Sequence, residues 1–256
     1  MDEIDAVADM VTQSKKLVVF TGAGISTESG IHDFRSPGGI WDKFDPSEFT
    51  YQNFLAYEKS REKSWALSKL TWSVISVAEP NRGHYAIAEL YHMGKLDCVI
   101  TQNIDNLHQR AGIPDELVIE LHGTAKWVNC LECGHRYPRE DIQVRLEKGE
   151  KVPRCDVCNG IMKPATISFG QPMPERETRE AENRSARCDL FLVAGSSLVV
   201  YPAAQMPLIA KGNGAKLVII NLMPTPHDGY ADTVINEKAG ETLFQIVEQA
   251  KKGLEG

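Results

Sequence analysis

The sequence predicts an α/β protein with a Rossmann-like, doubly wound parallel sheet and a smaller zinc-ribbon and helical module inserted into it. Two observations predict the sheet. Five short apolar runs have little strict alternation, and amphipathic helical patterns lie between several of them. A third observation, two CxxC pairs among charged residues, predicts the inserted module. The 256 residues suffice for one large and one small domain.

The five predicted strands run into small, polar or ionisable residues. The runs are residues 16–20, 97–100, 117–121, 189–195 and 216–220. After them come Thr21, Gly22, Ala23 and Gly24; Thr101, Gln102, Asn103, Ile104 and Asp105; His122 and Gly123; Ser196 and Ser197; and Asn221. Ligands of open α/β sheets bind beyond the carboxyl ends of the strands, so these converging ends predict one site.

Helical patterns cover residues 81–94, 201–214 and 239–253, and the first two end at glycine. Residues 46–79 read as helical, with no strand nearby. We therefore expect three parts. A Rossmann-like domain comprises 1–29, 80–123 and 165–256, a loop and helical module comprises 30–79, and a zinc-binding module comprises 124–164.

The charge and hydropathy patterns exclude two classes of partner. A net charge of −7 argues against direct nucleic-acid binding, which needs a dominant basic face. No apolar run approaches the roughly 18 residues of a membrane span, and the first ten residues are acidic where a signal peptide would be basic. We expect a soluble, cytoplasmic protein.

Four cysteines form a spaced double CxxC pattern, Cys130/Cys133 and Cys155/Cys158. Each CxxC turn directs two thiolates to one side, and two such turns close a tetrahedral zinc site. A redox pair and an iron–sulfur site are the alternatives, but a redox motif does not normally come as a spaced pair. Four cysteine ligands leave no open position, which predicts a structural metal. The other two, Cys98 and Cys188, are expected in the core.

One histidine stands apart from the other six. A single histidine is by default a structural residue, but His122 ends a predicted buried strand and precedes Gly123, where the other polar strand ends meet. An imidazole there suits general-base catalysis near neutral pH.

The loop "TGAGISTESGIHDFRSPGGIW" (21–41) begins like a dinucleotide fingerprint and then departs from it. Gly22 and Gly24 allow a close backbone approach to a phosphate, but Thr27 stands where the third glycine belongs. No Gly-Lys-Ser/Thr sequence is present, which disfavours a P-loop enzyme. Asp42 and Asp45 lie in a loop, so no acid is predicted at the second strand end, and the ordinary dehydrogenase interpretation weakens.

Five further motifs follow this loop in order: "TQNIDNLHQRAG", "ELHG", the CxxC pairs, "GSSLVVYPAA" and "INLMPT". With these motifs, the chain resembles the sirtuins over residues 14–252. Sirtuins are NAD-dependent protein-lysine deacylases. The resemblance implies that NAD is consumed, that nicotinamide and O-acetyl-ADP-ribose are released, and that His122 is the general base. It implies acetylated lysines of proteins as substrates, DNA-associated proteins among them, and NAD and structural Zn²⁺ as cofactors.

The resemblance also assigns roles by position. His122 and Asn103 would be catalytic, Asp105 would accept from the nicotinamide carboxamide, and Phe34 would shield the reactive ribose face. The implied cofactor residues are Gly22, Ala23, Gly24, Thr27, Asp33, Phe34, Arg35, Gln102, Asn103, Ile104, Asp105, His122, Gly195, Ser196, Ser197, Asn221 and Ala239. The implied substrate residues are Ile167, Phe169, Gly170 and Val199, on two segments that clasp the peptide as an added strand.

The chain departs from the family pattern at His32, where proline is usual, and at Gln171, where glutamate is usual. Loss of the proline predicts a more flexible empty cofactor loop and weaker NAD binding or slower turnover. Relatives that prefer succinyl or malonyl groups carry Tyr-x-x-Arg, whereas Tyr57 and Arg61 are four apart, which favours acetyl or other uncharged acyl groups.

Two other functions fit the same residues. One is a non-catalytic NAD-sensing interaction protein, which His122 and the Gln-Asn-Ile-Asp segment argue against. The other is a protein ADP-ribosyltransferase on the same fold, in which the first bond broken is the same.

Overall fold

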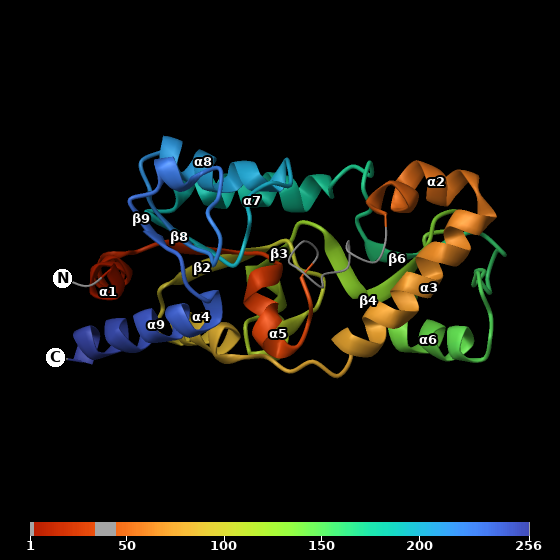
Figure 1. Cartoon of the computed structure of the whole chain (residues 1–256), viewed down its shortest axis with the longest axis horizontal. Helices are drawn as coiled ribbons and strands as arrows, with labels where there is room; N and C mark the ends of the chain where they lie inside the picture. The colour runs from red at the N-terminus through yellow and green to blue at the C-terminus, as the bar shows by residue number, and fades with distance from the viewer. Residues whose placement is uncertain (1–2, 34–44, 256) are drawn as a thin grey trace.

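The computed structural model describes residues 3–33 and 45–255, and within them it contains two sheets at opposite ends of an elongated molecule (Figure 1). The larger sheet has the strand order β3-β2-β1-β7-β8-β9, all parallel, and the smaller has the antiparallel order β5-β4-β6. The strands are β1 Leu17–Thr21, β2 Leu96–Thr101, β3 Val118–Glu120, β4 Gly123–Cys130, β5 Arg136–Pro138, β6 Met162–Thr166, β7 Leu190–Ala194, β8 Lys216–Ile220 and β9 Thr233–Ile235. The predicted fold class is confirmed.

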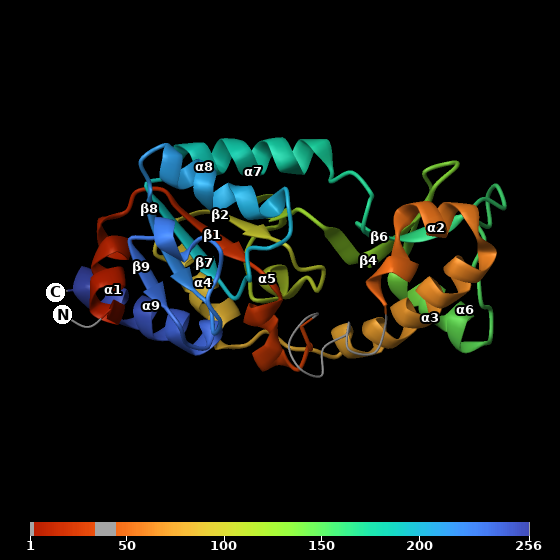
Figure 2. The same ribbon diagram turned by 45° about the horizontal axis from the view of Figure 1, so that its top comes forward.

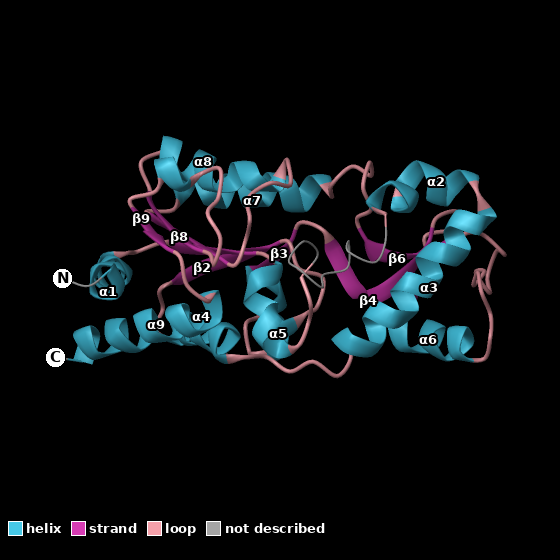
Figure 3. Cartoon of the chain, viewed as in Figure 1, coloured by secondary structure: helices cyan, strands magenta, loops and turns pink. Residues whose placement is uncertain are grey.

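Helices cover both faces of the larger sheet, which explains its unbroken apolar strands (Figures 2 and 3). In β1, Leu17 and Val19 join the core with α1 Glu3–Gln13, α4 Arg82–His92 and α9 Ala239–Glu255. The alternate residues Val18 and Phe20 join the core with α7 Glu175–Arg187 and α8 Met206–Gly212. Successive side chains of a strand point to opposite faces, so the apolar residues 17–20 face the two cores in alternation.

The two isolated cysteines lie in the second of these cores, as expected. Cys98 is 1% exposed and Cys188 7% exposed. Burial raises the pKa of the Cys188 thiol to about 12, so both behave as small apolar side chains.

The strand order reverses at β1, which pairs with β2 on one side and β7 on the other. The chain fills one half of the sheet with β1 to β3 and the other half with β7 to β9. This reversal is the place where open α/β sheets bind ligands, beyond the carboxyl ends of the central strands.

The smaller module comprises β4, β5 and β6 with three helices: α2 Tyr51–Ala56, α3 Glu58–Ile75 and α6 Arg139–Glu147. Its core gathers around Trp65 from α3, which is 1% exposed. Residues 46–79 are helical, as predicted, with one isolated bridge between Thr50 and Phe169. No helix among the described residues is long and apolar enough to cross a bilayer.

Three expectations need correction. Strand β9 lies outside the five predicted runs, so six strands replace the expected five. The helical pattern at 201–214 forms a 3-10 turn, Ala203–Gln205, and then α8, so the helix is shorter than predicted. The first turn of α8 accommodates Pro207. Helix α7 went unpredicted, because among its residues only Ala181 and Ser185 are buried.

The remaining elements are short. They are α5 Leu107–Arg110 and the 3-10 helices η1 Ala23–Ser29, η3 Pro46–Phe49, η4 Asp115–Leu117 and η6 Asp228–Tyr230.

Candidate active site and metal centre

The glycine-rich turn after β1 packs against the loop after β7. Gly24 N donates to Gly195 O at 2.8 Å, and Gly22 N donates to Ala194 O at 3.3 Å. A Cβ on Gly24 would lie 2.7 Å from the Gly195 Cα, and a Cβ on Gly195 would lie 2.3 Å from Ile25 N. These glycines are therefore required for backbone contact between β1 and β7, in addition to any approach by a phosphate.

The segment after this turn is the 3-10 helix Ala23–Ser29, not the α-helix of a dinucleotide fingerprint. The Thr27 hydroxyl donates to Gly24 O at 2.9 Å and closes the turn on itself. Thr27 is exposed, so its side chain faces solvent.

Ser26 joins two predicted site residues in a buried network. The Asn103 amide donates to Ser26 Oγ at 3.1 Å and to Gly22 O at 3.0 Å. Ser26 Oγ donates to Asp105 Oδ2 at 2.7 Å, and Asp105 Oδ1 accepts from Leu107 N at 3.0 Å. Asn103 is 9% exposed and Asp105 6% exposed, so the network fixes both side chains at the end of β2.

Two buried histidines underlie this network. His84 Nε2 is 3.5 Å from Ser26 Oγ, and His108 Nε2 is 2.9 Å from Thr21 Oγ1. Burial lowers the pKa of His84 to about 3 and that of His108 to about 4, so both are neutral. Their role is structural, as the default interpretation expects.

Ser26 was not predicted as a site residue, although it joins Asn103 to Asp105. The available signal was its place in "GAGIS", but its partners are brought to it by β2 and α4, from distant parts of the chain.

His122 lies between β3 and β4 and has a defined tautomer. Its Nδ1 is 3.0 Å from Gln102 O. A carbonyl only accepts, so Nδ1 carries the hydrogen and Nε2 keeps a free lone pair. Burial lowers the pKa of the imidazole, and the bond to Gln102 opposes this only in part, so His122 is neutral at pH 7. A neutral imidazole with a free Nε2 can accept a proton.

Gly123 determines the backbone direction after His122. Its φ is 70°, and an added Cβ would lie 2.1 Å from Ala165 O on β6. The Ile167 N–H then donates to His122 O at 2.9 Å. This bond joins the imidazole-bearing turn to the first predicted substrate segment.

The loops after β7 and β8 bring together the predicted adenosine residues. Gln102 Nε2 donates to Ser196 Oγ at 2.7 Å, and Leu198 N donates to the same oxygen at 3.3 Å. Asn221 donates to Met223 O at 2.6 Å, and its own carbonyl accepts from Asn236 at 3.1 Å. Ser197 is half-buried beside them, and Ala239 is buried at the start of α9.

The first predicted substrate segment is braced from the helical module. Tyr51 N donates to Phe169 O at 2.9 Å, and Gln52 Nε2 donates to Gly170 O at 3.0 Å. Gln171 Oε1 accepts from Ser168 N at 3.1 Å. A glutamate would offer the same acceptor oxygen, so this departure from the family pattern changes the charge and keeps the turn. On the second segment, Val199 is 45% exposed.

Other predicted residues lie at the junction of the modules or outside the described part. Ile104 and Ile31 pack against the small cluster of Trp72, Ile75 and Ala125. Asp33 is half-buried and His32 is exposed. Phe34 and Arg35 lie outside the described residues.

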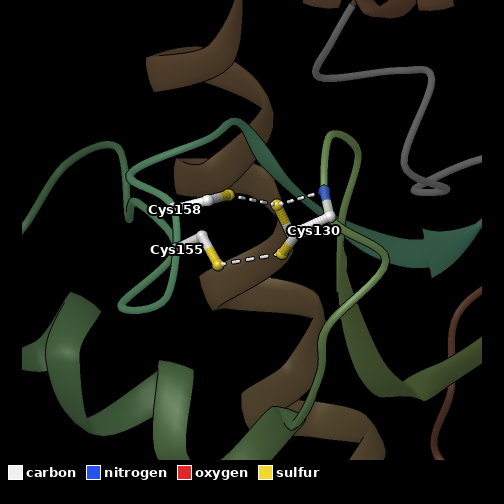
Figure 4. Close-up of side chains that lie close together, drawn as sticks. Cys130, Cys155 and Cys158 are labelled. Atoms are coloured by element: carbon white, nitrogen blue, oxygen red, sulfur yellow. Dashed lines mark hydrogen bonds between the residues drawn. The ribbon is translucent and has the colours of Figure 1, made fainter.

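The four cysteines predicted as ligands come together. Their Sγ atoms all lie within 4.8 Å of one another, with 3.5 Å between Cys130 and Cys158 and 3.6 Å between Cys133 and Cys155 (Figure 4). A tetrahedron with Zn–S bonds of about 2.3 Å has edges of about 3.8 Å, so the cluster fits Zn²⁺. Gly134 and Asn159, which follow the two pairs, have φ of 73° and 58° as their tight turns require.

The chain matches the Sir2 family over residues 22–202. It is 49% identical over 244 residues to the NAD-dependent protein deacetylase 1 of Bradyrhizobium diazoefficiens, covering 95% of each chain.

Two solved structures share the fold. A Sir2 structure with a deacetylated p53 peptide and 3'-O-acetyl ADP ribose has a TM-score of 0.89 and 39% identity, covering 96% of this chain and 98% of the other. A Sir2 structure with a myristoylated histone peptide has a TM-score of 0.81 and 40% identity, covering 99% and 98%.

Proposed function

This chain belongs to the Sir2 family, and on that premise we propose that it is an NAD-dependent protein-lysine deacetylase that releases nicotinamide and O-acetyl-ADP-ribose. The observation that carries the proposal is the neutral His122, with Nε2 free at the edge where β1, β2 and β7 end. In this reaction NAD supplies the ribose carbon to which the acyl oxygen bonds as nicotinamide leaves.

His122 acts as the general base. Its Nε2 takes a proton from a ribose hydroxyl, which makes that oxygen nucleophilic, and the hydrogen bond from Nδ1 to Gln102 O stabilises the imidazolium that forms. Because that bond also holds the ring in one orientation, the free nitrogen is directed consistently.

The nicotinamide and inner ribose bind beside Asn103, Ile104 and Asp105. The Asn103 amide hydrogens are occupied by Gly22 O and Ser26 Oγ, so Asn103 offers its side-chain carbonyl oxygen to the ligand. Asp105 is held as an acceptor by Ser26 and Leu107, which suits recognition of a carboxamide N–H.

The phosphates and the adenosine half bind along the loops after β1, β7 and β8. The residues proposed are Gly22, Ala23, Gly24, Thr27 and Asp33, with Phe34 and Arg35, and Gly195, Ser196, Ser197, Asn221 and Ala239. Contact between the first two of these loops supports a continuous surface for a dinucleotide.

The acylated peptide adds as a strand between Ile167–Gly170 and the segment that carries Val199. The side chains of Phe169 and Val199 are 44% and 45% exposed, which supports this proposal because they offer apolar contact to a peptide that lies between the two segments.

We propose acetyl or another uncharged acyl group as the one removed. Arg61 donates from Nη1 to Phe54 O and Leu55 O, both at 2.9 Å, and is 7% exposed. Its guanidinium therefore caps α2 and is not available to a charged acyl group.

Histone-type, DNA-associated proteins are proposed among the substrates, with support from the relative that holds a histone peptide. We also propose a cytoplasmic location, supported by six cysteines that are free of disulfides. We further propose the division of the chain at 30, 80, 124 and 165 into the three parts named above.

The test incubates the protein with an acetyl-lysine peptide, with and without NAD, and follows all products by mass. Deacetylation that requires NAD and yields acetyl-ADP-ribose is expected. Deacetylation without NAD would refute the proposal. ADP-ribose attached to protein, with no acetyl-ADP-ribose, would identify an ADP-ribosyltransferase instead.

A further inference from the structure

Tyr137 contacts the metal cluster from a neighbouring strand. Its hydroxyl oxygen lies 3.2 Å from Cys155 Sγ and 3.0 Å from the backbone nitrogen of Asp156. The Asp156 N–H can only donate, so it uses a lone pair of the hydroxyl and leaves the hydroxyl hydrogen for the sulfur. A metal-bound cysteine is a thiolate and accepts that hydrogen.

We propose that Tyr137 is a positioning residue of the metal centre, which donates a hydrogen bond to the Cys155 thiolate and slows the loss of the metal. The inference is independent of the reaction in the crevice, because it concerns a ligand that takes no part in that reaction.

The ring of Tyr137 is held in place by strand pairing and by core packing. Tyr137 lies on β5 opposite Val128 of β4, and it packs against the core that contains Trp65 and Cys155. The His135 ring meets it edge-on, with centroids 4.6 Å apart. Because the strand and the core fix the ring, the Tyr137 side chain loses little conformational entropy when its hydroxyl donates to Cys155 Sγ.

The loop that carries Cys155 is held by Arg145 of α6. Arg145 donates to Glu150 at 2.7 and 2.8 Å, to Arg154 O at 2.9 Å and to Asp156 at 3.3 Å. The arginine thus fixes both sides of Cys155, and the Asp156 N–H stays directed at the Tyr137 oxygen.

Cys155 is the cysteine to which this hydroxyl is hydrogen-bonded. Cys130 Sγ, by comparison, lies 3.5 Å from each of the Cys133 N–H, the Glu132 carboxyl and Cys158 Sγ. A hydrogen bond to a thiolate withdraws electron density and occupies a lone pair, which makes attack by protons or electrophiles slower.

The test compares the zinc-loaded full chain with Tyr137→Phe, which keeps the ring and removes the hydroxyl. Zinc release to a chromogenic chelator is followed at neutral pH, and alkylation by iodoacetamide is assigned to each cysteine by peptide mass. We expect zinc release from Tyr137→Phe to be about tenfold faster, and alkylation of Cys155 to be faster than in the original protein. Tyr85→Phe on α4, a tyrosine 53% exposed, is the matched control and should release zinc at the original rate.

A release rate of Tyr137→Phe within twofold of the original would overturn the proposal. Tyr137→Leu removes the ring as well. Fast release from the leucine variant with unchanged release from the phenylalanine variant would assign the effect to packing and would equally refute a role for the hydroxyl. Thermal unfolding of each variant in excess zinc checks that the chain is folded when release is measured.

Discussion

Gln102 donates from its side-chain nitrogen to Ser196 Oγ at 2.7 Å, which joins the loop after β2 to the loop after β7 across the end of β1. The main-chain carbonyl of the same Gln102 accepts from His122. One residue therefore connects the proposed adenosine loop to the proposed general base.

Ser196→Ala removes the acceptor that holds Gln102. Loss of one such hydrogen bond costs about 0.5–1.5 kcal/mol, so we expect the KM for NAD to rise about three- to tenfold with little change in kcat. Steady-state kinetics with NAD varied at saturating peptide provide the measurement. Ser76→Ala, at an exposed position on α3's C-terminal side, is the control. An effect confined to kcat would contradict the assignment.

His122→Ala should lower kcat by about 10²–10⁴-fold, the usual contribution of a general base. Zinc content and the unfolding temperature should stay near the original values, because His122 makes one side-chain hydrogen bond in the described structure. His92→Ala, at an exposed histidine of α4, serves as the control and should be fully active. Retained activity of His122→Ala would assign the base elsewhere.

The activity should persist below the ordinary titration range of histidine. Burial lowers the pKa of His122 below its usual 6.5, and the base works only when neutral. Therefore the midpoint of the decline of kcat/KM at acidic pH should lie below 6.5. The measurement is a pH profile of kcat/KM, with protein stability checked at each pH. A midpoint above 6.5 would be inconsistent with a desolvated imidazole.

Glu120, two residues before His122, should destabilise the fold at alkaline pH. Burial raises the pKa of its carboxyl to about 7, whereas an unfolded glutamate has the ordinary 4.5. The folded state thus binds a proton more tightly, and stability is lost as the pH rises between these values. Glu120→Gln keeps an oxygen that can accept from Gln109 and should stabilise by about 1–3 kcal/mol at pH 8.

Thermal unfolding at two pH values tests this expectation. At pH 8 the glutamine variant should unfold about 5 °C higher, and at pH 4.5 the two proteins should be nearly equal. An equal gain at both pH values would show that ionisation is not its cause.

His32→Pro should tighten NAD binding. Fixing φ before the cofactor loop reduces the freedom of the empty loop, a gain of about 0.4–1 kcal/mol, which corresponds to about a two- to fivefold lower Kd. Calorimetric titration with NAD measures it. His32→Ala removes the same imidazole without fixing φ and should bind as the original protein does. Unchanged NAD binding in the proline variant would show that the freedom of the loop at His32 does not weaken the binding of NAD.

The sequence was sufficient for features that depend on local pattern. Continuous apolar runs such as 216–220 predicted strands covered on both faces, and the CxxC spacing predicted that Cys130 and Cys155 would meet. The position of His122 at a strand end predicted a catalytic role, which stays a prediction, whereas His84 and His108 are buried and neutral.

Features that depend on contacts between distant segments were not predictable. Ser26 becomes a link because β2 and α4 bring Asn103 and His84 to it. The turn that opens the 3-10 helix Ala23–Ser29 packs against Gly195, a contact between distant segments that no local propensity encodes.

The contact between Gly24 and Gly195 also limits which sequences can adopt this fold. A side chain at either position would meet main-chain atoms of the other loop, and main-chain atoms are common to all residues. A second substitution that shortens a neighbouring side chain therefore cannot relieve this clash. In a library of all single and paired substitutions, these two positions should accept glycine alone, and neither should be rescued by change at its partner.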